Sequence, residues 1–446
     1  MDATRRATGA LALVTFVAIL MAACSSALDV KDPDVINPGD VTNADGAVAS
    51  YNGAIGDFTF ANDGDQGAQE GMVLISGVMA DEYFDAETFP TRIEYDSRAI
   101  NENNGTLTTA YFDLHKARVA LEGASAALQQ FAPTPVSRPA EMLALAGMTY
   151  VYFAEDYCSA VPFSARQPDG SIAYGTPLMT SQILDTAIAR FDAATALAPS
   201  ASILNLAAVG KGRALLDKAD FPGAATAVAA VPANFSYLTY HSVGTARQQN
   251  GVFIFNNQAP AGTARFSVSD TEGTNGLNFR SAGDPRVTSV LTGKGFDNVS
   301  PLYVLGKYAA ATSPVPVTSG IEARLIRAEA VLQGGNGAAM VDSLNALRAD
   351  AANNGGFTLT ALTDPGTAAG QADLLFRERA FWMFATGHRL GDLRRLVRQY
   401  GRTANAVFPT GPYTHANTVF GNNTELPVPF DERNNPNYTG CDYNTP

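Results

Sequence analysis

Helical spacing of apolar residues dominates the chain from about residue 105 onward. Between residues 107 and 130, Tyr111, Leu114, Ala117, Leu121 and Ala124 repeat every three or four positions, which places them on one face of a helix. The same spacing predicts helices over residues 107–130, 140–157, 181–197, 202–219, 321–332, 338–351, 372–385 and 390–400. Asp40 or Thr42 can begin an earlier helix that continues to about Phe58.

Consecutive helices of this length, joined by short turns, predict antiparallel hairpins. We expect these hairpins over about residues 105–230 and 320–400. They resemble tetratricopeptide hairpins, although no strict period of about 34 residues survives. Alanines such as Ala144 and Ala207 suit close helix packing. The predicted scaffold is therefore mainly α, a superhelix of helical hairpins.

Two stretches, about residues 60–104 and 231–319, lack this helical spacing. They are rich in Gly, Asn, Thr and Ser, with short apolar runs such as VFIF. We expect a loop-rich lobe with few short strands, within a single domain that spans residues 41–446. Loops of this length usually form a functional surface.

The N-terminal segment has the pattern of a bacterial lipoprotein signal. Two arginines precede an apolar run that is as long as a signal h-region but short for a membrane-spanning helix. The letters LMAAC, ending at Cys24, resemble a lipobox, so we expect removal of residues 1–23 and acylation of Cys24. Residues 24–40 then form a lipidated tether. The alternatives are an ordinary secretory signal with an incidental cysteine, or an uncleaved anchor.

Charge and cysteine content narrow the possible partners. Lys and Arg number 30 against 43 Asp and Glu, a net charge of −13, and the absence of a basic cluster argues against nucleic acid. No apolar run of membrane length follows Cys24, so we expect lipid alone to hold the chain at a membrane. Cys158 and Cys441 remain as an even pair, which can form a disulfide or be two unrelated thiols.

Catalytic and cofactor motifs are missing from the sequence. It contains no nucleophile-elbow serine, HExxH, phosphate-binding loop or dinucleotide fingerprint. The acidic turn at 63–67 lacks the spacing of a calcium loop. Zinc is disfavoured because the four histidines are widely scattered, at His115, His241, His388 and His415. We therefore expect no catalytic residue, metal or cofactor, and a binding protein rather than an enzyme.

Aromatic and amide side chains in the loop-rich stretches suit a polar, uncharged ligand such as a glycan. Aromatic rings stack on apolar sugar faces, while Asn, Asp and Gln bond to hydroxyl groups. The alternative is that many of these rings belong to the core, where we also expect Trp382, the sole tryptophan. The candidate ligand contacts are Tyr83, Phe84, Tyr95, Tyr237 and Tyr240.

Four segments, in order, resemble the SusD/RagB family of outer-membrane nutrient-binding lipoproteins. They are EMLALAGMTYVYFAEDYCSAVPF from Glu141, KYAAATSPVPVTSGIEARLIRAEAVLQGG from Lys307, RERAFWMFATGHRLGDLRRL from Arg377 and LPVPFDERNNPN from Leu426. The third is the most specific, being similar to the family's EGHRW-x-DLRR passage. Cys158 stands where the family has glycine, and Leu390 where it has an aromatic residue.

The third segment also has a physical interpretation of its own. Gly387 separates two helices, so charged residues from both are expected to gather near the break. A catalytic or metal-binding His-Asp-Glu cluster is the alternative, which the neighbouring arginines disfavour because positive charge opposes a cation. We expect a structural network that locks the two helices, formed by Glu378, His388, Arg389, Asp392 and Arg394.

The resemblance implies a SusD-like fold and a lipid-anchored protein on the outer-membrane surface. Such a protein captures an oligosaccharide or similar nutrient and passes it to a TonB-dependent transporter, without chemistry of its own. The competing prediction is a periplasmic scaffold lipoprotein whose helical repeats bind protein partners in envelope assembly. The loop-rich lobe disfavours the scaffold, because hairpins alone would suffice for one.

Overall fold

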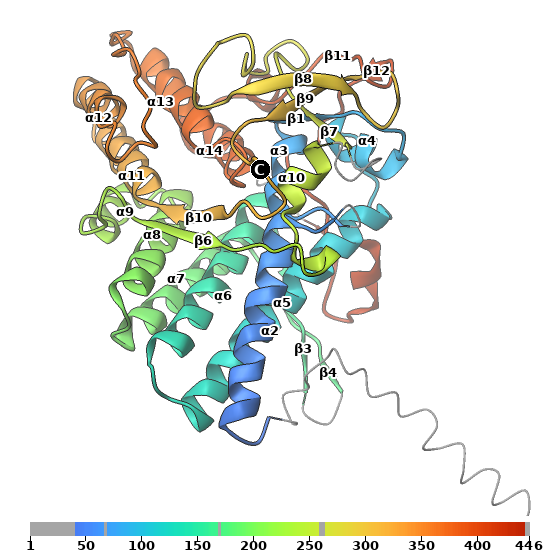
Figure 1. Ribbon diagram of the computed structural model, residues 1–446, viewed down its shortest axis with the longest axis vertical. Coiled ribbons are helices and arrows are strands. Elements are labelled where there is room, and N and C mark those ends of the chain that lie inside the picture. Colours follow the sequence, from blue (N-terminus) through green and yellow to red (C-terminus); the bar gives the residue numbers. More distant parts are fainter. Residues whose placement is uncertain (1–40, 67–68, 168–170, 258–263, 442–446) are drawn as a thin grey trace, which may run out of the picture. The chain divides into compact units, whose positions relative to one another are not determined.

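Helical hairpins dominate the regular structure of the computed structural model (Figure 1), which describes residues 41–66, 69–167, 171–257 and 264–441. The expected signal over residues 1–23, Cys24 and the tether over residues 24–40 lie outside the described residues. The described residues from Asn43 onward form one unit.

The long helices begin and end close to the positions that apolar spacing predicts. Polar caps set several of the starts: the Asn104 side chain accepts from the Leu107 N–H at 3.0 Å, and Ser319 accepts from the Glu322 N–H at 3.1 Å. The long helices are α2 (Ala44–Asp63), α5 (Gly105–Phe131), α6 (Ser137–Asp156), α7 (Thr180–Ala196), α8 (Ala201–Asp217), α11 (Gly320–Gln333), α12 (Gly337–Ala349), α13 (Ala368–Trp382) and α14 (Arg389–Tyr400).

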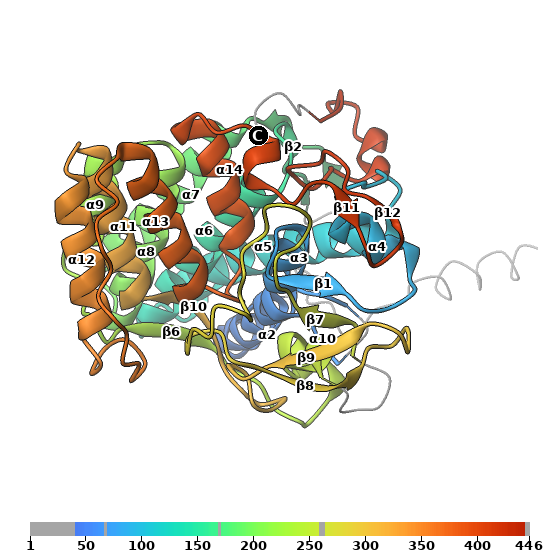
Figure 2. The same cartoon turned by 90° about the horizontal axis from the view of Figure 1, so that it is seen from above.

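Successive hairpins lie side by side, as Figure 2 shows. α5 packs against α2 and α6, α6 against α7, and α7 against α8. α8 continues this order to α9 (Phe221–Ala227) and α11, and α11 contacts α12 and α13. Each helix therefore buries its apolar face against a neighbour in the row, and the predicted mainly α architecture is confirmed.

A single aromatic ring fills the space where α6, α7 and α8 meet. Phe191 of α7 is fully buried and lies against Gly147 of α6 and Gly210 of α8. A Cβ atom on Gly147 would lie only 2.7 Å from Phe191 Cε1, and one on Gly210 would be closer still. The two glycines thus let three helices close around the ring.

Short helices occupy parts of the stretches that were predicted as loops, and this corrects the prediction. α3 (Met72–Met79), α4 (Pro90–Asp96) and α10 (Gly251–Asn256) lie there. All eight residues of α3 are buried, so it has no polar face to produce a helical period in the sequence. The remaining short elements are α15 (Ala404–Val407) and the 3₁₀ turns η2 (Ala246–Gln248) and η3 (Phe430–Asn434).

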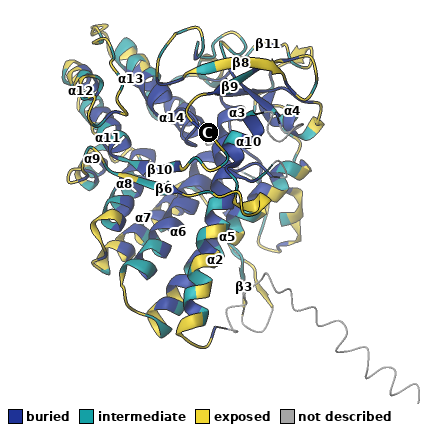
Figure 3. Cartoon of the chain, in the orientation of Figure 1, coloured by how far each residue is buried: buried dark blue, intermediate teal, exposed yellow. Residues whose placement is uncertain are grey.

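Each strand in the described ranges pairs with one antiparallel partner. Strands β1, β7, β8 and β9 gather in the predicted lobe, where Figure 3 shows β8 largely exposed. The pairs are β1 (Tyr83–Asp85) with β7 (Phe266–Val268), β2 (Val161–Pro162) with β5 (Pro177–Leu178), β3 (Ala165–Arg166) with β4 (Ile172–Ala173), β6 (Ser236–Thr239) with β10 (Val315–Ser319), β8 (Ser289–Lys294) with β9 (Pro301–Leu305), and β11 (Pro412–Tyr413) with β12 (Thr418–Val419).

A disulfide joins the end of α6 to the C-terminal segment. It links Cys158 and Cys441, whose Cα atoms lie 5.7 Å apart. The backbone around it is paired as well, since the Cys158 N–H donates to the Leu426 carbonyl at 2.9 Å. Among the helices in the described part of the chain, none is both long and apolar enough to cross a membrane.

The substitution Gly210→Ala should lower the free energy of unfolding by about 1–3 kcal/mol, because the added methyl group would press on the Phe191 ring in a packed core. Gly123→Ala in α5 is the matched control. A Cβ atom there meets nothing within 4 Å. Alanine should therefore raise the free energy of unfolding by at most about 1 kcal/mol, because it has the higher helix propensity. Urea unfolding followed by circular dichroism measures both variants. A Gly210→Ala protein as stable as the wild type would contradict this packing.

Candidate binding pocket

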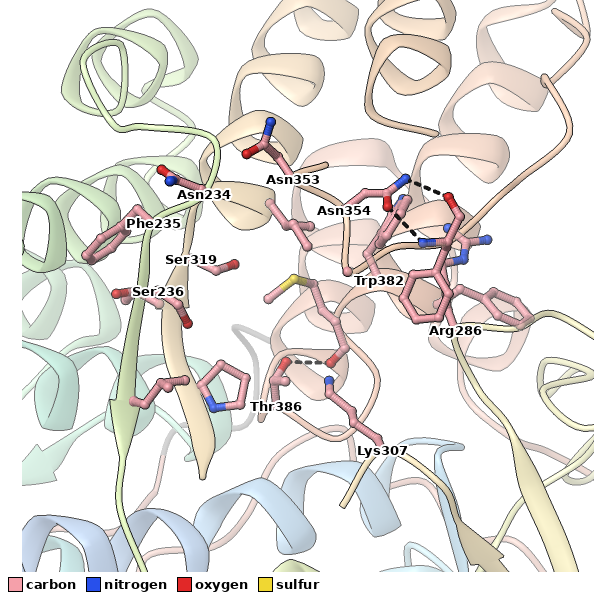
Figure 4. A pocket seen from close by; sticks show the side chains of 18 of the residues that line it. Asn234, Phe235, Ser236, Arg286, Lys307, Ser319, Asn353, Asn354, Trp382 and Thr386 are labelled. Carbon is pink, nitrogen blue, oxygen red and sulfur yellow. Dashed lines mark hydrogen bonds between the residues drawn. The ribbon is translucent and has the colours of Figure 1, made fainter. Parts of the chain in front are cut away.

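A pocket of about 530 Å³ opens between the β6–β10 pair and the end of α13. Figure 4 shows Ser236 and Ser319 on the strand side and Arg286, Asn354 and Trp382 on the opposite side. Concave sites that mix apolar walls with a few polar groups are typical of small-molecule binding. The lining comes from segments distant in sequence, at 233–238, 285–288, 306–307, 316–321, 353–357 and 381–386.

One wall of the pocket is an aromatic group held from both sides. The Arg286 guanidinium carbon lies 4.6 Å from the centre of the Trp382 ring, and the Phe357 ring meets the indole edge-on with centroids 6.2 Å apart. Trp382 is only 7% exposed. The indole is therefore buried, as expected for a core residue, and it also lines the pocket.

Polar contacts fix this wall before any ligand arrives. Arg286 donates to Asp284 at 2.6 and 2.8 Å and to Glu378 at 2.8 and 3.1 Å. The Asn354 side chain donates to the Leu347 and Phe357 carbonyls at 3.3 and 3.2 Å. The loop after α12 and the turn around Arg286 are thus held in place, which reduces the entropy lost on binding.

Two buried polar atoms at the pocket lack a hydrogen-bond partner among the described residues. β10 shifts its register against β6 between Pro316 and Thr318, a bulge of the kind that redirects side chains. The Thr318 Oγ1 and Trp382 Nε1 atoms are buried, and neither bonds to any of the described residues. A buried polar group in this state is costly unless water or a ligand bonds to it. The pocket can therefore bond to a polar ligand.

Three of the five residues predicted to contact a ligand are buried. Tyr83, Phe84 and Tyr95 are 0%, 3% and 0% exposed, and their rings pack against other aromatic rings inside the lobe. They present no face to a ligand in solution, so the prediction is wrong for these three. Their rings instead supply the apolar area that a loop-rich lobe needs to fold.

The other two predicted contacts line a separate, smaller pocket. Tyr237 and Tyr240 border a cavity of about 270 Å³ beside α2 and α6. The Tyr237 hydroxyl donates to Glu141 at 2.7 Å, while Tyr240 is 77% exposed. This cavity is a second candidate site, although it lacks an indole.

The five charged residues predicted as one network are buried, but their side chains bond to other partners and not to one another. The arrangement is thus corrected: most of the five bond to partners brought in by long-range packing, while Asp392 alone bonds to arginines of α13 and α14. Glu378 bonds to Arg286 and Arg348, Arg389 pairs with Asp81, His388 Nε2 lies 3.1 Å from Glu322, Arg394 donates to the Ala154 and Tyr157 carbonyls, and Asp392 bonds to Arg379 and Arg395.

Asp392 is the member of the five that locks α13 to α14. It accepts from Arg379 of α13 at 2.9 and 3.0 Å and from Arg395 of α14 at 2.8 Å. Arg395 also donates to Glu329 of α11 at 3.0 Å. Burial alone would raise the pKa of Asp392, but the two guanidinium groups hold it well below its usual range. The carboxylate is therefore ionised and fully paired.

Within the described ranges, no three His, Cys, Asp or Glu side chains gather as a metal site requires. The pocket residues were missed in the sequence because they come from scattered segments. Several of them, Lys307 and Trp382 included, nevertheless lie inside the segments that resemble a known family. The resemblance of these segments to a known family was the one feature of the sequence that could have pointed to the pocket residues.

The sequence matches no protein-family model and no curated protein. Solved structures do match it. Surface glycan-binding protein A from Bacteroides uniformis superposes with a TM-score of 0.66 at 13% identity, covering 90% of this chain and 99% of that one. The chain has the SusD-like fold.

Two further structures agree. A SusD-like carbohydrate-binding protein from Bacteroides vulgatus has a TM-score of 0.63 at 15% identity, with 89% and 97% of the two chains covered. A laminarin-binding SusD-like protein has a TM-score of 0.64 at 14% identity, with 90% and 99% covered. The SusD-like fold that the four segments implied is therefore confirmed.

In this SusD-like chain, Asp392→Asn should lower the free energy of unfolding by about 3–5 kcal/mol, because it leaves two buried arginines short of a carboxylate. Folding lowers the pKa of Asp392, so its ionised carboxylate stabilises the folded state at neutral pH. This stabilisation begins to fall once the pH drops below the unfolded value of about 4, and it is lost fully only below the lower pKa of the folded state.

The matched control is Asp373→Asn, which breaks an ion pair with Arg402 whose side chains are 65% and 31% exposed. That change should cost less than about 1 kcal/mol. Chemical denaturation at pH 7 and pH 3 compares the two variants with the wild type. Equal losses from both substitutions would show that burial does not distinguish the two pairs.

Proposed function

We propose that this chain is a non-catalytic, lipid-anchored binding protein of the outer-membrane surface. It captures an oligosaccharide in the 530 Å³ pocket and delivers it to a TonB-dependent transporter. The structural neighbours whose titles name glycan or carbohydrate binding support the ligand class. The lipobox-like LMAAC segment and the family resemblance support the anchor and the transporter.

The observation that carries the proposal is the pocket wall around Trp382. A sugar ring presents an apolar face together with a rim of hydroxyl groups. The pocket supplies Phe357, backed by the mostly buried Trp382, for the first, and Asn234, Ser236 and Asn353 for the second. The indole N–H is buried and without a partner among the described residues, so a hydroxyl oxygen could accept from it once the surrounding side chains shift.

The sole tryptophan allows a direct test of glycan binding. Oligosaccharides that enter the pocket should change the emission of Trp382, because they alter its solvent contact, and the change should saturate with concentration. Trp382→Phe keeps an aromatic ring but removes the indole N–H, so calorimetry should show affinity lowered about fivefold to tenfold.

Tyr240→Ala is the matched comparison, because it removes the exposed ring of the smaller pocket. It should leave affinity unchanged. The reverse result, with Tyr240→Ala weakening binding and Trp382→Phe not, would place the glycan in the smaller pocket. No saturable binding by any member of a broad oligosaccharide panel would overturn the proposed ligand class.

The location and partner need a separate experiment. Protease treatment of intact cells should degrade a surface protein, whereas a periplasmic scaffold would survive it. Purification in mild detergent with the anchor intact should bring a large β-barrel transporter with the chain. Survival of the chain, or its isolation without a transporter, would contradict surface delivery.

A further inference from the structure

The charge of the pocket differs from that of the rest of the chain. Acidic residues outnumber basic ones by 13 in the full sequence. Among the described residues that line the pocket, Arg286 and Lys307 carry charge and none is Asp or Glu. A carboxylate-free lining is unexpected in so acidic a protein.

Arg286 contributes little net charge to this lining. Asp284 and Glu378 both accept hydrogen bonds from its guanidinium group. Glu378 also accepts from Arg348 at 2.7 Å. Two arginines thus meet two carboxylates in a closed group, and their fields largely cancel at the pocket.

Lys307 is not held in a salt bridge of this kind, although Glu82 attracts its ammonium from a longer distance. Figure 4 shows its side chain reaching into the pocket below Thr386, and its Nζ donates to the Phe384 carbonyl at 2.7 Å. Among the described residues, no carboxylate pairs with it at salt-bridge distance. Its Nζ has three protons to donate, and within the described ranges it donates to one acceptor, the Phe384 carbonyl.

The nearest acidic groups behind the pocket do not neutralise this ammonium. Asp81 is paired with Arg389 at 2.6 and 2.9 Å. Burial raises the pKa of Glu82 to about 8, which weakens its ability to balance the Lys307 charge at neutral pH. Packing around its ammonium lowers the pKa of Lys307 to about 8, which still leaves it mostly charged at pH 7.

We infer that the oligosaccharide captured here is acidic, and that its carboxylate or sulfate group lies against Lys307. This inference rests on the proposed function and adds the charge class of the ligand. An anionic group would accept the remaining Lys307 protons in a charge-assisted bond, which is about twice as strong as a neutral one. A lining without carboxylates avoids repelling such a ligand.

The wild-type protein tests this with chemically matched ligand pairs. Oligogalacturonate is compared with its methyl ester, and a chondroitin sulfate oligosaccharide with its desulfated form, by calorimetry at pH 7. At least one acidic member should bind about tenfold or more tightly than its neutralised partner. That preference should shrink as salt is added. The two pairs distinguish a carboxylate from a sulfate as the recognised group.

Three variants assign the preference to Lys307. Lys307→Gln should remove it, and Lys307→Arg should retain it. Lys116→Gln makes the same change in net charge on α5, where the side chain is 47% exposed and outside the pocket. It should leave the preference intact. Circular dichroism confirms that each variant is folded.

The outcomes separate the inference from the proposed function. Neutral oligosaccharides that bind as tightly as acidic ones would overturn the inference and leave glycan binding standing. So would a folded Lys307→Gln protein that keeps the preference. Should Lys307→Gln fail to fold, the matched ligands and the salt series on wild type decide. Binding of no oligosaccharide, acidic or neutral, would overturn the proposed function itself.

Discussion

A buried carboxylate between two arginines fixes the C-terminal hairpin of this protein. Asp392 can be tolerated in the interior because Arg379 and Arg395 satisfy its charge from two helices at once. Arg395 extends the contact to Glu329 of α11, so the hairpin is tied to the helical row. Trp382 lies one helical turn beyond Arg379 on α13, and its position in the pocket wall therefore follows from this pairing.

The pocket also depends on the pairing of buried polar groups, but there some of the groups remain without a partner. Arg286 is fully paired and serves as a rigid support for the indole ring. Lys307, Thr318 Oγ1 and Trp382 Nε1 retain bonding capacity that the described residues do not use. A folded interior seldom leaves such groups unused. Such atoms occur elsewhere in the described chain too, so binding is assigned to this site because they adjoin a concave pocket whose lining mixes apolar and polar groups.

Local patterns in the sequence predicted what depends on near neighbours. The spacing of apolar residues gave the long helices to within a few residues, because one buried face imposes that period. It missed α3, whose eight residues are all buried and therefore show no period. Composition wrongly suggested Tyr83, Phe84 and Tyr95 as ligand contacts, because aromatic residues are as common in a core as in a binding surface.

The sequence by itself determined the hairpin scaffold, the presence of a loop-rich lobe and the segments that resemble SusD-like proteins. Tertiary structure decided which charged residues pair, since Arg286 and Glu378 are 92 positions apart and meet only after α13 is docked. It also decided that Trp382 borders a pocket and that Lys307 stands there without a carboxylate. Periodicity is a property of neighbouring residues, whereas charge compensation and cavity shape belong to the packed chain.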